Sequence, residues 1–159
     1  MLERGIALAD EVGFSGHPLA MRSRLGNVEL LRGNFDAAER HQQALLDDPV
    51  AASVPWLLSM ALLGKSAIAR RRGEYELADR LLLRAWELPR SKSTPVMWTL
   101  VLVARGYLAD QLCDNERALE YKTDALRTSV SLGVPRHLAF ALEGCAGAVA
   151  IEPSGEHAE

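Results

Sequence analysis

The sequence predicts an all-α fold in which antiparallel helix pairs stack into an array. Two columns of small residues, repeated every 40 residues along the chain of 159, support this prediction. Small side chains are needed where two helices approach each other closely. A spacing kept over the whole chain therefore indicates equivalent helix crossings in successive units. The first column is Ala38, Ala78, Ala118 and Ala158, and the second is Gly26, Ser66, Gly106 and Ala146.

Three further columns stay apolar in every unit, as expected if each unit makes the same contacts with its neighbours. Trp86 belongs to the third of them, and we therefore expect it in the core. Runs of alternating apolar and polar residues, which are typical of strands, are scarce. The columns are Met21/Ala61/Val101/Ala141, Val28/Ile68/Leu108/Ala148 and Ile6/Leu46/Trp86/Leu126.

Each complete unit contains two helices separated by a short break. The breaks of the first two complete units fall at Gly33-Asn34 and Gly73-Glu74, and Pro89 ends the second of these units because proline cannot continue a helix. In the third, Ser93-Thr94-Pro95 combines a capping residue with proline in the first helical turn. The predicted helices are about 2–12, 17–32, 35–47, 54–72, 75–88, 95–112, 116–132 and 136–151.

The units join into one predicted domain over residues 1–159. Gly133 ends a second helix and lies three periods after Gly13, so the first helix of the chain is the second half of an earlier unit. The predicted organisation is a partial repeat over 1–13, repeats over about 17–49, 54–89 and 94–133, and a partial repeat over 136–159.

Several of these residues follow one another in a familiar order. Leu25-Gly26-Asn27 precedes Gly33-Asn34-Phe35, Ala38 and Ala44-Leu45, and the next units offer Gly73-Glu74-Tyr75, Ala78, Ala85, Ala118 and Ala125-Leu126. They resemble the tetratricopeptide repeat, whose period is about 34 residues. The longer period found here adds nearly one turn to each of two helices. The resemblance implies a right-handed α-solenoid, a superhelix of antiparallel helix pairs.

Two segments extend the resemblance to a class of larger proteins. Residues 8–13, LADEVG, and 139–144, AFALEG, are similar to the tetratricopeptide-like region of bacterial signalling regulators, including LuxR-type and maltose-regulator-type ATPases. This similarity implies a non-catalytic protein- or peptide-binding scaffold, a fragment of a signalling or transcriptional regulator. A small-molecule effector-sensing domain of such a regulator is the alternative. An apolar-walled pocket would favour the sensor, and an open groove would favour the peptide binder.

The resemblance also implies a concave binding face lined by the first helix of each unit. The position after the small-residue column and the position three residues further on share one helix face. A merely solvated inner surface is the alternative. The candidate ligand- or peptide-binding residues are Asn27, Arg70, Arg71, Tyr107, Asp110 and Gln111.

The charge and composition limit the classes of partner that we expect for this chain. A net charge of −3, with 25% charged residues, is ordinary for a soluble globular protein and favours neither direct nucleic-acid binding nor membrane binding. Arg70-Arg71-Arg72 is expected to be a solvated cluster at a helix end, with contact to a phosphate or an acidic partner as the alternative. Charges interrupt the first twenty residues, unlike a signal peptide. Two separated cysteines, Cys113 and Cys145, favour a reducing cytoplasm.

No pattern of residues predicts catalysis. His17, His41, His137 and His157 form no group with the cysteines at metal-ligand spacing. Neither a Gly-x-Ser-x-Gly elbow nor a phosphate-binding glycine loop is present in the sequence. We therefore expect no enzyme activity, no metal and no cofactor.

The last predicted first-type helix carries an apolar stripe without a visible partner helix. Such a stripe is typical of an interface. We expect either a longer array or a homo-oligomer formed through the open ends of the solenoid. The candidate interface residues are Leu138, Leu142 and Cys145.

Overall fold

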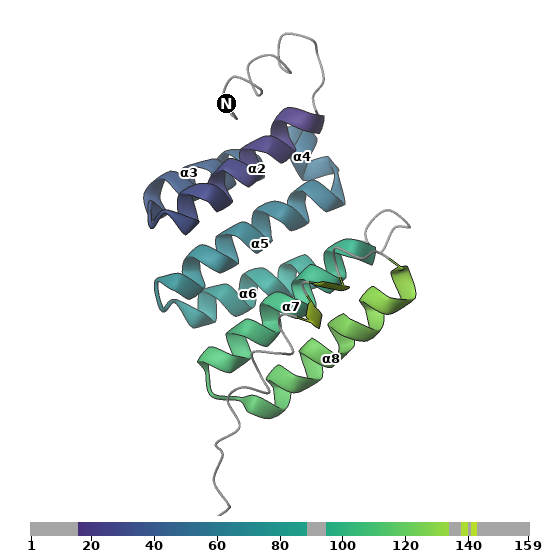
Figure 1. Cartoon of the computed structure of the whole chain (residues 1–159). Coiled ribbons are helices and arrows are strands. Elements are labelled where there is room, and N and C mark those ends of the chain that lie inside the picture. The colour runs from purple at the N-terminus through teal and green to yellow at the C-terminus, as the bar shows by residue number, and fades with distance from the viewer. Residues whose placement is uncertain (1–15, 89–94, 134–137, 140, 143–159) are drawn as a thin grey trace, which may run out of the picture. The chain divides into compact units, whose positions relative to one another are not determined.

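The computed structural model describes residues 16–88, 95–133, 138–139 and 141–142. Within these ranges all regular secondary structure is helical, which confirms the predicted all-α class. None of the helices in these ranges combines the length and the apolar character that crossing a membrane requires. The helices, labelled as in Figure 1, are α2 (Gly16–Leu31), α3 (Phe35–Leu46), α4 (Pro49–Ser53), α5 (Pro55–Arg71), α6 (Tyr75–Trp86), α7 (Pro95–Gln111) and α8 (Asn115–Leu132).

The chain consists of two compact units, residues 1–97 and 98–159. The first unit contains α2 to α6, and the second contains α8 and all but the first turn of α7. The predicted helix over 2–12 and most of the one over 136–151 lie outside the described residues, as does Ala158. The single domain predicted over 1–159 stays a prediction.

Helical hairpins recur at the spacing found in the sequence. The second helices of the three hairpins begin at Phe35, Tyr75 and Asn115, which are 40 residues apart. Three residues connect the two helices in each hairpin, and so short a connection makes the helices antiparallel. The described helix ends lie within two residues of the predicted ones.

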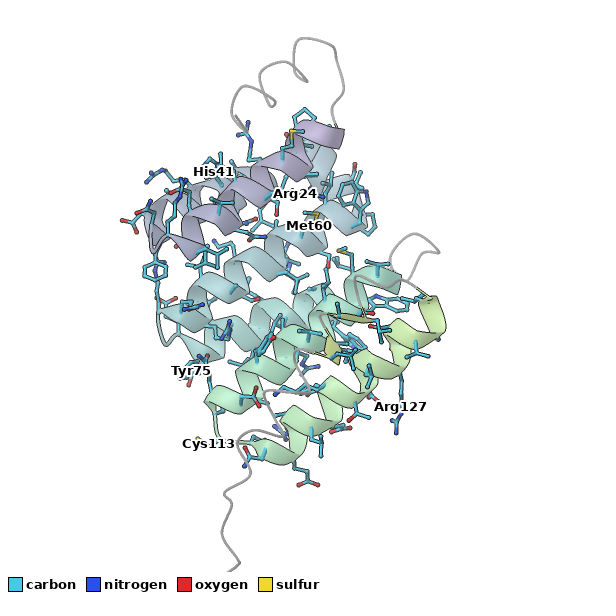
Figure 2. The ribbon with its side chains drawn as sticks, viewed as in Figure 1. Arg24, His41, Met60, Tyr75, Cys113 and Arg127 are labelled. Carbon is cyan, nitrogen blue, oxygen red and sulfur yellow. The ribbon has the colours of Figure 1, made fainter. Side chains whose placement is uncertain are left out.

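The same turn closes each hairpin. Its middle residue has a left-handed backbone, with φ of 81° at Gly33, 78° at Gly73 and 58° at Cys113. In the first turn the amide of Asn34 donates to the carbonyl of Glu29 at 2.9 Å, and the other two turns repeat this bond, which is typical of a Schellman motif. Glycine adopts this conformation readily and cysteine does not. Figure 2 shows Cys113 at the end of α7, in the turn that leads to α8.

In the first unit, consecutive long helices pack on one another. Helix α2 packs on α3, α3 on α5 and α5 on α6, and α2 also contacts α5 directly. Aliphatic side chains of α2, α3 and α5 meet in the core together with one alanine of α4. The buried members of this cluster are Leu19, Leu45, Ala51, Leu57 and Ala61.

The predicted small-residue columns are buried wherever the structure describes them. Ala38 and Ala78 are 0% exposed and Ala118 is 1% exposed. Gly26, Ser66 and Gly106 of the second column are also buried. By contrast, the described members of the column that contains Trp86 are only partly buried, so Trp86 is less buried than the prediction of a core residue implies.

Helix α4 is a short element that the sequence did not predict. It begins at Pro49 after Asp48, whose Oδ1 accepts hydrogen bonds from the amides of Val50 at 2.8 Å and Ala51 at 3.0 Å. An aspartate cap followed by proline in the first turn is a strong start signal. Asp48-Pro49 therefore begins a helix at the point where the sequence analysis ended the first complete repeat, at about residue 49.

The left-handed turn generates a prediction about Cys113. We expect Cys113→Gly to raise the free energy of unfolding by about 1 kcal/mol, because it removes the left-handed strain of a residue with a Cβ. Gly73→Ala is the matched control and should lower stability by about the same amount; no atom lies within 4 Å of a Cβ added there, so only the backbone is affected. Urea denaturation of the three proteins measures both changes. Loss of stability in Cys113→Gly would contradict this account.

Candidate functional site

The predicted binding residues are divided between the two units. Asn27 lies on α2, and Arg70 and Arg71 form the last turn of α5, so these three belong to the first unit. Asn27 and Arg71 are exposed, whereas Arg70 is partly buried. In the first unit the structure therefore brings together the two first helices that carry the predicted residues, because α2 packs on α5.

The predicted residues of the second unit all lie on α7. Gln111 is exposed, whereas Tyr107 and Asp110 are partly buried and take part in contacts with α8. Asp110 in particular holds a buried lysine within its own hairpin. The sequence analysis placed Asp110 in a binding face without anticipating this structural partner.

That partner is Lys122, which the sequence analysis missed. Its side chain is only 1% exposed, and its Nζ donates to both carboxylate oxygens of Asp110, at 2.8 and 2.6 Å. The same Nζ lies 6.0 Å from the centre of the Tyr107 ring. The stem of Lys122 occupies space left by Gly106, because a Cβ on that glycine would lie 2.8 Å from Lys122 Cγ. The lysine thus crosses the hairpin from α8 to α7.

A buried glutamine occupies the equivalent position in the first hairpin. Gln42 is 0% exposed, and its Nε2 donates to the Ser23 carbonyl at 3.1 Å and to Asn27 Oδ1 at 3.2 Å. The hydroxyl of Ser23 donates to Gln42 Oε1 at 3.3 Å. A Cβ on Gly26 would lie 2.7 Å from Gln42 Nε2. The glutamine therefore crosses the first hairpin as Lys122 crosses the third.

The sequence contains a pattern that could have predicted the buried positions of Gln42 and Lys122. Gln42, Leu82 and Lys122 form a further 40-residue column, four residues after the buried alanines and three before another buried position. Helical periodicity places such a position on the core face. A polar residue there, opposite a glycine, indicates a side chain that crosses the hairpin.

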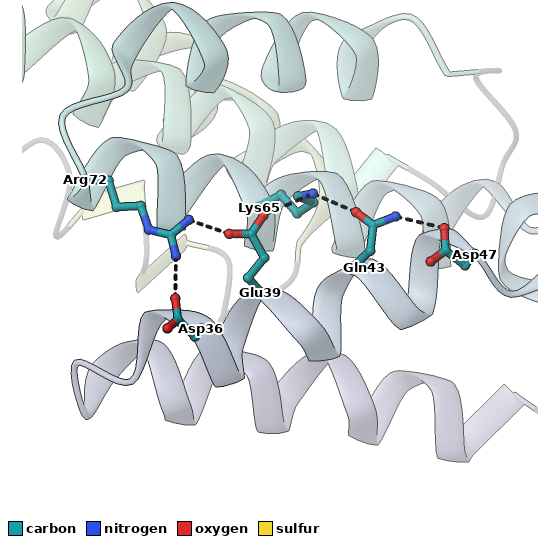
Figure 3. A network of polar contacts seen from close by, with 6 residues as sticks. All are labelled: Asp36, Glu39, Gln43, Asp47, Lys65 and Arg72. Carbon is teal, nitrogen blue, oxygen red and sulfur yellow. Dashed lines mark hydrogen bonds and ion pairs between the residues drawn. The ribbon is translucent and has the colours of Figure 1, made fainter.

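A second polar network fastens α3 to α5 in the first unit (Figure 3). Arg72 donates to Asp36 at 3.0 Å and also to Glu39, which in turn lies 3.2 Å from Lys65. Lys65 donates to Gln43 at 2.7 Å. Arg72 was expected to be one of three solvated arginines, but the carboxylates of Asp36 and Glu39 on α3 bind its guanidinium group.

The network changes the acid–base behaviour of its members. Burial raises the pKa of the Glu39 carboxyl, but hydrogen bonds and charges from Arg72 and Lys65 outweigh burial and leave this pKa below its ordinary value. The hydrogen bond to Glu39 raises the pKa of Arg72. Outside the network, the hydrogen bond from Asn34, supported by Arg32, lowers the pKa of Glu29. The ionised forms are thus favoured in the folded state.

The part of the chain that the structure describes was also searched for a metal site and for a ligand pocket. No group of three or more His, Cys, Asp or Glu side chains among the described residues could hold a metal ion. A shallow hollow of about 500 Å³ lies at the α2–α3 turn, and none of the predicted binding residues is among its described lining. Its described lining is Gly33, Asn34, Phe35, Asp36, Ala37 and Arg40.

The predicted interface residues lie at the edge of the described chain. Leu138 is partly buried and Leu142 is 50% exposed, while Ala141 between them is fully buried. Cys145 lies outside the described residues. Their role as an interface stays a prediction.

Comparison of the chain with protein-family models and with curated proteins finds no match in either set.

The buried ion pair predicts a clear pattern of stability changes. We expect Asp110→Ala to lower the free energy of unfolding by about 3 kcal/mol, because it leaves a buried ammonium without its carboxylate. The double variant Asp110→Ala with Lys122→Leu should recover most of the loss, since Leu82 fills the equivalent position of the second hairpin. Chemical denaturation of the single and double variants tests this. If the single and the double variant lost the same free energy of unfolding, Asp110 and Lys122 would not be energetically coupled.

The α3–α5 network predicts a pH dependence. Since the pKa of Glu39 is lower in the folded state than its ordinary 4.5, its ionised form stabilises the fold above that pH, and the contribution is lost as the pH falls through the folded value. We expect Glu39→Gln to lower stability at pH 7 by about 0.5 kcal/mol, a small effect because the carboxylate is partly exposed.

The stability of Glu39→Gln should also fall less than that of the wild type between about pH 5 and pH 3. Thermal unfolding across this range measures the difference, with Glu76→Gln on α6 as the exposed control. If the stability of Glu39→Gln fell with pH as steeply as that of the wild type, the lowered pKa of Glu39 would not be the cause of the pH dependence.

Proposed function

We propose that this chain is a non-catalytic scaffold that binds a protein or peptide through the first helices of its hairpins. The observation that carries the proposal is the recurrence of one hairpin, with one turn geometry, at intervals of 40 residues. Repeated hairpins that present equivalent helices side by side offer an extended surface, which is how helical-repeat proteins bind their partners. The proposed arrangement is a right-handed α-solenoid of the tetratricopeptide type.

The buried alanines and glycines support this arrangement. Ala38, Ala78 and Ala118 occupy equivalent buried positions, and Gly26 and Gly106 provide equivalent close approaches within their hairpins. The resemblance of residues 8–13 and 139–144 to bacterial regulators supports a further step. We place the scaffold in a cytoplasmic signalling or transcriptional regulator, where it mediates a protein–protein interaction.

A peptide-display selection tests the proposal. A library of random 16-residue peptides is panned on the purified chain, and dissociation constants of the enriched peptides are measured by fluorescence anisotropy. We expect the enriched peptides to bind the chain with micromolar dissociation constants. Their affinity should fall about tenfold for the double variant Asn27→Ala with Arg71→Ala, because a few contact residues supply most of the binding free energy of an interface.

Arg71 is exposed, and its replacement should leave the melting temperature almost unchanged, whereas Asn27→Ala also removes an acceptor of the buried Gln42 amine and should lower the free energy of unfolding by about 1 kcal/mol. Arg84→Ala on α6 is the control, as it removes an exposed arginine from a second helix. Failure to enrich any peptide would refute the scaffold proposal. Tight binding of a small effector to the same face, detected by calorimetry, would favour the sensor function instead.

A further inference from the structure

The three hairpins share one turn geometry and one pattern of small residues. Their second helices begin 40 residues apart, and the middle residue of each turn has the same left-handed backbone. Because the small-residue columns recur at the same spacing, a second helix fits the crossing of any of the three first helices by shape alone. Misassembly and exchange of equivalent elements are characteristic failures of repeat proteins.

One buried position distinguishes the hairpins from one another. It lies four residues after the column alanine and is occupied by Gln42 in the first hairpin, Leu82 in the second and Lys122 in the third. Each of these side chains is at most 1% exposed. A buried amide requires hydrogen-bonding partners, and a buried ammonium also requires an opposite charge. The first helix that faces the buried residue must therefore supply them.

Among the described first helices, only α2 matches Gln42. The Ser23 hydroxyl donates to Gln42 Oε1 at 3.3 Å, and Gln42 Nε2 donates to Asn27 Oδ1 at 3.2 Å. The residues at the equivalent two positions are Leu63 and Ala67 on α5 and Val103 and Tyr107 on α7. Neither of these helices offers a polar side chain at both positions. Gln42 buried against either of them would lose a partner that α2 provides.

Lys122 is matched by α7 in the same way. Its Nζ donates to both carboxylate oxygens of Asp110, at 2.8 and 2.6 Å. The residue equivalent to Asp110 is Leu30 on α2 and Arg70 on α5. Against α2 the ammonium would be buried without a carboxylate, and against α5 it would meet a second cation. Both pairings leave a buried charge uncompensated, which is strongly unfavourable.

The second hairpin has an apolar match. Leu82 has no hydrogen-bonding group in its side chain, and α5 carries Leu63 and Ala67 at the two positions where α2 is polar. Against α2, Leu82 would leave the Ser23 hydroxyl without its acceptor, and against α7 it would leave Asp110 without its cation. Each second helix therefore has one matching first helix.

We propose that the polar residues that meet inside the first and third hairpins form a pairing code, which prevents off-register exchange of helices between copies of this chain. Exchange in register restores every contact and is not opposed. Exchange shifted by one or two hairpins leaves at least one polar group unmatched, so the code acts against wrong pairings. The residues of the pairing code are Ser23, Asn27, Gln42, Asp110 and Lys122.

The pairing code differs from a stabilising role in one measurable respect. Replacing a buried polar pair by apolar residues of similar volume is often neutral or stabilising. Removal of the whole code should therefore leave the native hairpins stable and only make wrong pairings more favourable. This inference does not depend on the proposed scaffold function.

The first test removes the pairing code from the full chain. The substitutions of this code-free variant are Ser23→Ala, Asn27→Ala, Gln42→Leu, Asp110→Ala and Lys122→Leu. The control variant, Glu76→Ala with Arg84→Ala, also removes one acid and one base, but from exposed positions of α6. Wild type and both variants are refolded from urea at low and high protein concentration and analysed by size-exclusion chromatography with light scattering.

We expect the code-free variant to unfold at a urea midpoint no lower than that of the control. At high concentration it should also form larger species that wild type and control do not form. Exchange in register is equally open to all three proteins, so these additional species report off-register pairing. Refolding of the code-free variant as cleanly as the control would overturn the proposal. A urea midpoint clearly below that of the control would also overturn it, because the polar residues would then serve stability.

The second test moves the ion pair of the third hairpin into the first. Gln42→Lys places a buried ammonium opposite Leu30, and we expect it to lower the urea midpoint by about 1 M. Adding Leu30→Asp, at the position equivalent to Asp110, should recover most of this loss. Leu31→Asp is the matched control, because it adds the same charge to the same turn of α2 at a position that is 80% exposed.

The recovery must depend on position for the pairing code to hold. An unchanged urea midpoint in Gln42→Lys would mean that the first hairpin tolerates a mismatched cation. Equal recovery by Leu30→Asp and Leu31→Asp would mean that any nearby carboxylate suffices. Either result would overturn the proposal, whereas recovery by Leu30→Asp alone would support it.

Discussion

The close approach of two helices within each hairpin is the constraint on which the other features depend. Two helices can cross this closely only if one of them lacks bulk at the crossing. In the third hairpin a Cβ on Gly106 would already lie 3.6 Å from the carbonyl oxygen of Ala118, so the two small-residue columns face each other there. The 40-residue recurrence of small residues thus records a steric requirement that every hairpin shares.

This constraint also creates room for polar side chains inside the hairpins. Gln42 and Lys122 extend over glycines of the facing helix and reach polar groups beyond them. Burying an amide or an ammonium is unfavourable unless hydrogen bonds and charges compensate for the lost water. Both residues have such partners, and each connects the interior to a polar residue of a first helix. Packing and surface chemistry are therefore coupled in these two hairpins, while Leu82 fills the same position of the second hairpin with an apolar side chain.

The helices could be predicted because their ends depend on local conformational preferences. Gly33 and Gly73 lie in the breaks that the sequence analysis placed there, and the alanines and glycines of the small-residue columns are buried. A local signal was misjudged in one place, because Asp48 begins α4 rather than only ending the preceding unit. The candidate site was predicted less well, since Asp110, which was predicted to bind a partner, is paired with Lys122 of its own hairpin.

The sequence by itself determined the all-helical class, the 40-residue spacing of the hairpins and the buried alanines, because these follow from local backbone preference and helical periodicity. Only the tertiary structure decided which polar residues find one another. Arg72 is 33 residues from Glu39, and Gln42 is 15 residues from Asn27, so neither contact is visible in a local pattern. Such pairs form because helix packing brings distant side chains within hydrogen-bond reach, where partial burial makes an unfilled donor or acceptor unfavourable.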